Sequence, residues 1–240
     1  MCAEKHKKYF TLRLDDCTMQ DTRIMEIFAR YGFRGCTFYM NTGLFGHDWS
    51  AFVGAPHVRC SREQAIAAYA GQDVQVHTVS HFALNTLPDP QITAEVNLDA
   101  ENIRAMFGHA PVGLSWPGGD RDWNAHTVDV VLATTDMRYG SCTTRTGRFD
   151  LPTRFMTWYP TCAFSDGDSL SLLQTFIDAE PTEDLLFKAW GHGYEPDSSN
   201  TWDRFEQMIR MISEAAAQDE SIVILTNSEF YELFKDKIPS

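Results

Sequence analysis

A chain of 240 residues, 43% hydrophobic and 22% charged, has the size and composition of one globular domain of a barrel or large α/β type, and we predict a single domain over residues 1–240. The net charge of −13 argues against nucleic acid or an anionic membrane as a partner. The longest apolar runs are far shorter than a membrane span, so no membrane-spanning segment is expected.

The N-terminal residues are charged and lack the apolar core of a signal peptide. The cysteines include no CxxC pair, and their dispersal favours ordinary reduced thiols over a disulfide framework; they are Cys2, Cys17, Cys36, Cys60, Cys142 and Cys162. We therefore expect a cytoplasmic protein, although a leader removed before this sequence begins would leave the same N-terminus.

The first predicted strand begins near Tyr9 and ends in two adjacent carboxylates, Asp15 and Asp16. Neighbouring side chains on a strand point to opposite faces, so these two aspartates are expected to have different roles. Two like charges at a strand end are costly unless a cation offsets them. The alternative interpretation is a solvated turn or the N-cap of the next helix.

Strands and helices are then predicted to alternate along the chain, apart from residues 143–167, which are rich in turn formers and aromatics. This alternation implies a parallel sheet with right-handed crossovers. About seven such units without a Rossmann glycine signature favour a closed or nearly closed barrel. Strands are expected over 36–40, 73–77, 112–116, 137–142, 185–190 and 221–226, and helices over 21–31, 61–70, 93–107, 125–132, 170–177, 202–217 and 228–234.

In barrels of this kind, the residues just past the carboxyl ends of the strands carry the chemistry. Five predicted strand ends bring polar groups to one rim. These positions are Asp15 and Asp16, His77 and His81, Pro117 to Asp120, Gly191 and His192, and Asn227 with Glu229.

His77 and His81 are four residues apart, so one helical turn would place both imidazoles on the same face. Together with Asp16 they would supply two nitrogens and one oxygen and leave positions open for water and substrate. This pattern is typical of a catalytic metal site. Ordinary surface or core histidines are the alternative.

His192 lies between two glycines at the end of another predicted strand, and the glycines would let the backbone turn sharply and leave room beside the ring. A general acid and a simple turn histidine are both compatible with this position. Trp190 could line an apolar pocket or belong to the core.

Four motifs stand in the order Leu-Asp-Asp (14–16), His-Thr-x-x-His (77–81), Trp-Pro-Gly-Gly (116–119) and Trp-Gly-His (190–192). This order resembles the polysaccharide deacetylase family (NodB homology, carbohydrate esterase family 4) over nearly the whole chain. The resemblance implies an α/β fold, a distorted (β/α)7 barrel of the NodB-like type. It also implies metal-dependent hydrolysis of an N-acetyl or O-acetyl group on a saccharide substrate, with N-acetyl as the first candidate.

By this resemblance, Asp16, His77 and His81 match the family's metal ligands. The implied cofactor is one divalent ion. Zinc is the first candidate, and cobalt, manganese and nickel are the alternatives. Such an ion would polarise the acetyl carbonyl and lower the pKa of water.

The remaining catalytic roles also follow from the resemblance. Asp15 matches the general base, and His192 matches the general acid that protonates the leaving amine. The backbone N–H of Gly118 falls where the family places a donor to the oxyanion. Trp116 and Trp190 are expected on the substrate side.

This chain departs from the family pattern in the first and third motifs. The family usually has Thr before the aspartate pair and Gly after it, where Arg13 and Cys17 stand. Its third motif usually begins with Arg and carries Tyr, where Ser115 and Gly118 stand. The loss of Tyr should widen or flatten the substrate side.

The missing arginine normally orients the base. Arg13 is two residues from Asp15 and therefore on the same strand face, so we hypothesise that it replaces the missing arginine as the charge partner. Arg154 is the rival for this role.

Two other functions remain open at this stage. One is a catalytically inactive barrel that binds saccharide, which the altered third motif supports. The other is a metal-free hydrolase of cyclic amides with the same fold, which the retained metal ligands oppose. Among weaker candidates, Asp166 or Asp197 could orient His192, 158–162 could line a sugar subsite or simply pack, and His47, His57, His109 and His126 are interpreted as ordinary.

Overall fold

The strands form one parallel sheet in the computed structural model of the protein, which describes residues 6–240. Along the sheet the order is β5-β4-β3-β2-β1-β7-β6, and β8 pairs with β1. This confirms the predicted parallel α/β architecture. The strands are β1 (Lys8–Asp15), β2 (Cys36–Met40), β3 (Asp73–Val76), β4 (Gly113–Ser115), β5 (Tyr139–Ser141), β6 (Cys162–Ala163), β7 (Leu185–His192) and β8 (Ile222–Ile224).

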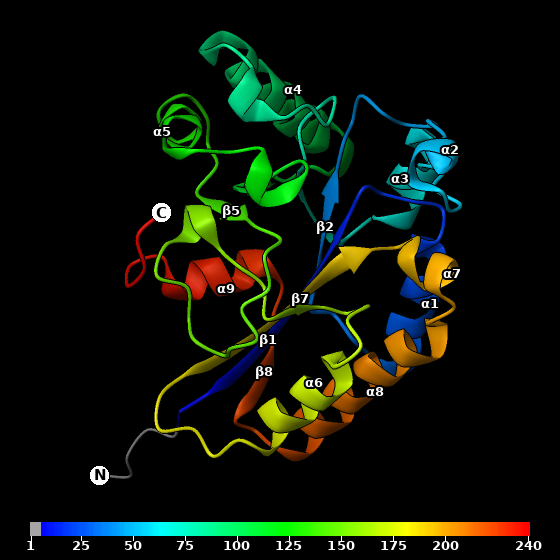
Figure 1. Cartoon of the computed structure of the whole chain (residues 1–240), viewed down its shortest axis with the longest axis vertical. Helices are drawn as coiled ribbons and strands as arrows, with labels where there is room; N and C mark the ends of the chain where they lie inside the picture. The colour runs from blue at the N-terminus through cyan, green and yellow to red at the C-terminus, as the bar shows by residue number, and fades with distance from the viewer. Residues whose placement is uncertain (1–5) are drawn as a thin grey trace.

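Helices cover the outside of this sheet. In Figure 1, α1, α6 and α8 lie together on one side of the central strands, α4 and α5 lie above them, and α9 lies on the other side. The helices are α1 (Asp21–Tyr31), α2 (Ser50–Val53), α3 (Arg62–Ala68), α4 (Asp89–Phe107), α5 (Ala125–Thr134), α6 (Ser169–Asp178), α7 (Glu195–Ser199), α8 (Trp202–Gln218) and α9 (Asn227–Phe234), with short 3₁₀ turns η1 (Leu84–Thr86), η2 (Gly119–Arg121) and η3 (Phe155–Thr157).

The sheet is strongly curled. Arg13 on β1 donates a hydrogen bond to Ser115 on β4 (2.9 Å), and Lys188 on β7 donates one to Ser141 on β5 (3.0 Å). Neither pair of strands is adjacent in the sheet, so these bonds cross its hollow side. All four side chains are fully buried, which gives the barrel a polar interior directly beneath its rim.

The alternation of side chains along β1 separates two cores. Phe10, Leu12 and Leu14 point outward and pack with the apolar faces of the surrounding helices. Tyr9 belongs to a second, mostly aromatic cluster, which closes the lower part of the barrel interior. That cluster includes Tyr39, Tyr139, Phe155, Trp158, Phe230, Tyr231 and Phe234. Arg13 and Asp15 share the inward face and lie above this aromatic floor.

The register brings most strand ends to the same level. Asp15 is level with Tyr39 on β2 and His192 on β7, while Val76 is level with Met40 and Leu114. β8 is the exception, because its last residue Ile224 pairs with Phe10, five positions before Asp15.

The low end of β8 corrects the prediction that Asn227 and Glu229 belong to the functional rim. Asn227 is buried and donates to Tyr39 Oη (3.1 Å) inside the barrel. Glu229 accepts from the backbone N–H of Thr226 (2.8 Å) in the capping box that begins α9. Both residues therefore support the interior and the closing helix.

Most predicted elements are present, with differences at their ends. A capping box formed by Ser61 and Gln64 begins α3. α4 begins at Asp89, four residues earlier than predicted, and β7 continues through His192. The region 143–167, for which the sequence predicts no regular element, contains η3 and the two-residue strand β6.

Among the described residues, the thiols of Cys17, Cys36, Cys60, Cys142 and Cys162 are free and buried. Cys2 and the rest of residues 1–5 lie outside the described residues. Within 6–240, no helix has both the length and the apolar character needed to cross a membrane.

Candidate metal centre and active site

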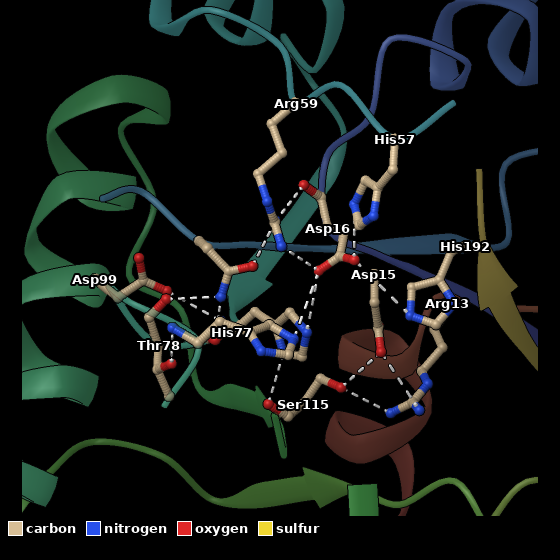
Figure 2. Close-up of polar contacts among 12 residues, drawn as sticks. Arg13, Asp15, Asp16, His57, Arg59, His77, Thr78, Asp99, Ser115 and His192 are labelled. Atoms are coloured by element: carbon tan, nitrogen blue, oxygen red, sulfur yellow. Dashed lines mark hydrogen bonds and ion pairs between the residues drawn. The ribbon is translucent and has the colours of Figure 1, made fainter. Parts of the chain in front are cut away.

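Three side chains at the rim converge as potential metal ligands. Oδ1 of Asp16 lies 3.6 Å from Nε2 of His77 and 3.7 Å from Nε2 of His81, and the three ligand atoms lie within 4.8 Å of one another. Two atoms that each lie about 2.1 Å from a tetrahedral ion are about 3.4 Å apart. The donor set and its spacing therefore fit a divalent ion such as zinc (Figure 2).

The charge states of these groups suit metal binding. Burial lowers the pKa of His77 to about 4 and also lowers the pKa of His81, so both imidazoles are neutral near pH 7. Nδ1 of His77 donates to the backbone oxygen of Ser115 (2.8 Å), which leaves Nε2 facing Asp16. Burial opposes the charge of Asp16, but Arg59 and His57 outweigh it and hold the pKa of Asp16 well below its usual range.

The two histidines meet through a loop, although their spacing would also suit one helical turn. Residues 77–81 contain no helix, and Thr78 (φ +67°) and His81 (φ +58°) are in the left-handed region. Asp99 on α4 holds the start of this loop, because its Oδ2 accepts from the backbone N–H of His77 (3.0 Å). Asp16 also has a positive φ (+85°), so three strained residues cluster at the site.

Asp15 lies on the inner side of the rim. Its Oδ2 accepts from Ser115 Oγ (3.0 Å) and lies 3.5 Å from Nη2 of Arg13. Its Oδ1 is buried and has no hydrogen-bond partner among residues 6–240. One carboxylate oxygen is thus held in place while the other is available to accept a proton in the cleft.

His57 and Arg59 are site residues that the sequence did not reveal. Nε2 of His57, interpreted as ordinary, lies 3.1 Å from Oδ2 of Asp16, and Nη2 of Arg59 donates to Oδ1 of Asp16 (2.8 Å). They reach Asp16 because the segment around Arg59 forms an antiparallel bridge with Thr18. No local motif signals this long-range contact.

His192 faces the other carboxylate oxygen, with Nε2 4.0 Å from Oδ2 of Asp16. Its Nδ1 donates to Oε1 of Glu195 (2.7 Å), at the start of α7. Burial disfavours the imidazolium, but the hydrogen bond with Glu195 and the charge of Asp16 outweigh it and raise the pKa of His192 to about 9. A protonated imidazole at neutral pH is able to act as an acid.

The partner of His192 is therefore Glu195, which corrects the earlier candidates. Asp197 accepts from Trp202 Nε1 (2.7 Å), and Asp166 accepts from the backbone N–H of Ala163 (3.1 Å). Glu195 comes three residues after His192, and this short spacing is the sequence signal that indicates the contact.

Replacing Glu195 by Gln should lower the pKa of His192 in the metal-free protein. The amide removes a negative charge and offers a weaker acceptor, so the imidazolium loses stabilisation and deprotonates at lower pH. An NMR titration of the His192 ring carbons in the metal-free protein measures this directly. The ring resonances of exposed His126, which pairs with Asp89, are the internal control and should be the same in the variant and the wild type. A His192 pKa that stays near 9 would show that Glu195 does not govern it.

The site opens into a cleft of about 530 Å³. Trp116, Trp190 and Tyr194 line it, as does Gly118 in a left-handed conformation (φ +63°). Phe52 on α2 also lines the cleft, with 89% of its side chain exposed. The predicted substrate residues Trp116 and Trp190 are thus at the cleft, although Trp116 is itself nearly fully buried.

Two other predicted positions lie elsewhere. Arg154 is exposed and donates to the backbone oxygen of Ser240 (3.3 Å), so it is not placed against Asp15, and Arg13 occupies that position. This corrects the rival assignment of the charge partner. Trp158 is buried in the aromatic cluster of the barrel interior, which agrees with packing.

The glycines beside His192 allow close approach of other elements. A Cβ on Gly191 would lie 2.2 Å from the Phe164 ring, and one on Gly193 would lie 1.8 Å from Oδ1 of Asp21. Neither glycine has a left-handed φ. These two glycines are required by close packing beside His192 rather than by the predicted sharp turn.

Solved structures share this fold. Peptidoglycan deacetylase PdaC from Bacillus subtilis superposes with a TM-score of 0.57 and 16% identity, covering 98% of this chain and 95% of that one. The Xyl-CE4 domain of a multidomain xylanase from the hindgut metagenome of Trinervitermes trinervoides gives 0.55 and 15%, covering 98% and 94%. A BA3943 mutant, described as a CE4 family pseudoenzyme with restored enzymatic activity, gives 0.56 and 16%, covering 94% and 68%. At these identities the likeness shows the fold, and it confirms the predicted NodB-like barrel.

Sequence comparison addresses the family. No curated protein sequence matches this chain. The family profile described as polysaccharide deacetylase matches residues 3–139, which is more than half of the 240 residues and includes Asp15, Asp16, His77, His81 and Gly118. The chain belongs to the polysaccharide deacetylase family.

Proposed function

We propose that this protein is a metal-dependent deacetylase that removes an acetyl group from a saccharide, with an N-acetyl group as the first candidate. The observation that carries the proposal is the convergence of Asp16, His77 and His81 beside a carboxylate and an imidazole that face the same cleft. A divalent ion held by these three ligands would polarise the acetyl carbonyl and lower the pKa of water. Zinc suits two imidazoles and one carboxylate, and cobalt, manganese and nickel remain alternatives.

Asp15 acts as the general base in this proposal. Its Oδ1 lacks a hydrogen-bond partner within residues 6–240 and can accept the proton of the attacking water. Ser115 and Arg13 hold its other oxygen, so the carboxylate keeps one orientation. We therefore propose that Arg13 takes the role that the third-motif arginine usually has in the family.

His192 acts as the general acid. An amine leaves the tetrahedral intermediate only when it is protonated, and the Nε2–H of the imidazolium supplies that proton. Glu195 stabilises the charged ring through Nδ1, which keeps Nε2 oriented toward the cleft. The backbone N–H of Gly118 is proposed as a donor to the oxyanion, and Trp116 and Trp190 as walls for the sugar.

A second candidate is a catalytically inactive barrel that binds saccharide. The family fold includes a protein described as a pseudoenzyme, and this chain has Ser115 and Gly118 where the family usually has Arg and Tyr. The convergence of the base, acid and metal ligands favours the enzyme. The retained metal ligands also disfavour a metal-free hydrolase of cyclic amides.

Acetate release from a panel of N-acetylated and O-acetylated saccharides tests the proposal. We expect the zinc-loaded protein to release acetate, activity to fall to background after dialysis against a chelator, and added zinc to restore it. The metal content before and after dialysis is measured in parallel. Saccharide binding without acetate release at any metal loading would favour the binding barrel instead.

A further inference from the structure

Arg59 is buried and makes hydrogen bonds to two different strand ends. Nη1 donates to the backbone oxygen of Asp16 (2.7 Å), and Nη2 donates to Oδ1 of the same residue (2.8 Å). Nη1 also donates to Oδ1 of Asn41, directly after β2 (2.6 Å). The guanidinium lies over the ring of Trp49, 4.4 Å from its centroid, which fixes its plane.

Asn41 continues the connection to the histidine loop. Its Nδ2 donates to the backbone oxygens of His77 and Thr78, the latter at 2.9 Å. Asn41 is buried, and its side chain uses both the acceptor and the donor end. Arg59 and Asn41 therefore form a chain of hydrogen bonds from Asp16 to the backbone of His77. Figure 2 labels Arg59, Asp16 and His77 in this chain.

The position of Arg59 has a clear electrostatic cost for metal binding. The guanidinium of Arg59 contacts Oδ1 of Asp16, which is also the atom that faces His77 and His81. The positive charge of Arg59 therefore repels a divalent ion bound at this oxygen. A carboxylate oxygen has two lone pairs and can accept from Arg59 while it binds an ion. The contact therefore fixes the orientation of Asp16 and leaves its Oδ1 able to bind an ion.

We propose that Arg59 and Asn41 are positioning residues that hold Asp16 and the 77–81 loop at the separation a divalent ion requires. Asp16, Thr78 and His81 all have positive φ values, so this backbone needs outside support to keep its conformation. The planar fork of arginine provides that support, because it contacts Asp16 and Asn41 at once. This inference rests on the proposed function and deepens it.

The test is the affinity for Zn²⁺, measured by competition with a chromogenic chelator, in Arg59→Met and Asn41→Ala. We expect Zn²⁺ to bind about 10- to 100-fold more weakly in both variants, the usual cost of losing a group that orients a metal ligand. Asn41→Ala alters no charge, so weaker binding in that variant cannot come from a change in the charge around Asp16, and it is the deciding result. Arg62→Met removes an exposed positive charge three residues away and is the matched control, with an affinity expected within about 2-fold of the wild type.

Unfolding of the metal-free variants, followed by circular dichroism, separates positioning from general support of the fold. Unchanged or tighter Zn²⁺ binding in folded Arg59→Met, or unchanged binding in Asn41→Ala, overturns the proposal. Lower thermal stability with unchanged Zn²⁺ affinity also overturns it. If Arg59→Met does not fold, Asn41→Ala decides the question, since it alters no charge. A wild-type protein that fails to bind Zn²⁺ overturns the proposed function as well, whereas normal wild-type binding with unaffected variants overturns only this inference.

Discussion

Replacing Asp15 by Asn should lower the rate of acetate release by about 10²- to 10⁴-fold, the usual contribution of a general base. Asn has nearly the same shape as Asp, and its side-chain oxygen can still accept from Ser115 Oγ, as Oδ2 of Asp15 does now. The amide cannot take a proton from water, so the chemical step is lost while the cleft keeps its form. Asp15 is not one of the three proposed ligands, so Zn²⁺ affinity should stay within about 10-fold of the wild type.

The substitution also leaves Arg13 as a buried cation without its carboxylate. Both side chains are almost completely buried, and removing one partner of such a pair typically costs about 3–5 kcal/mol of unfolding free energy. Acetate release is therefore measured well below the unfolding temperature of the variant. Asp136→Asn, an exposed aspartate substitution, is the control and should retain full activity. Wild-type turnover in Asp15→Asn would rule out Asp15 as the base.

The parts of the site that the sequence predicted are those set by local pattern. β1 carries apolar residues at alternate positions (Phe10, Leu12 and Leu14), β3 carries Val74 and Val76, and polar residues follow both strands directly. In a parallel sheet such ends meet at one rim, so the sequence alone predicts the convergence of Asp16, His77 and His81. The local backbone conformation could not be predicted. The spacing of the two histidines suits one helical turn, but a loop with positive φ angles brings them together.

The parts that the sequence missed depend on contacts between distant segments. Arg59 and His57 reach Asp16 only because residues around 58–60 pair with 17–19 in an antiparallel fashion, and no periodicity in this loop predicts that pairing. The position of β8 relative to the rim also depends on a long-range feature, the register of its pairing with β1. A strand that pairs with Lys8–Phe10 ends far below the rim, and this removed Asn227 and Glu229 from the site.

The choice between Arg13 and Arg154 could not be made from spacing alone. Arg13 was a good candidate because it shares a strand face with Asp15. What decided the placement was the curl of the sheet, which brings Ser115 on β4 across to Arg13 on β1 and leaves Arg154 at the surface. The small serine in the third motif gives Arg13 both room and a hydrogen-bond acceptor.

Replacing Arg13 by Met should lower acetate release by about 10²-fold and lower the unfolding free energy by about 3–5 kcal/mol. Arg13 is fully buried, it donates to Ser115 Oγ (2.9 Å), and it lies 3.5 Å from Asp15. Without it, the buried charge of Asp15 is uncompensated and the serine loses the donor that fixes its hydroxyl. Arg154→Met is the matched control. It removes an exposed arginine, so activity should be unchanged and stability should change by no more than about 0.5 kcal/mol.

A third variant, Arg13→Lys, separates charge from geometry. The ammonium group restores a positive charge next to Asp15, so most of the lost stability should return. It lacks the planar fork that lets Arg13 donate to Ser115 Oγ from Nη1 while Nη2 faces Asp15, so the carboxylate should remain poorly oriented and turnover should recover only in part. Chemical denaturation reports the first effect, and kcat for acetate release reports the second. Full activity in folded Arg13→Met would show that Asp15 needs no arginine partner, and full recovery of turnover in Arg13→Lys would show that charge alone is sufficient.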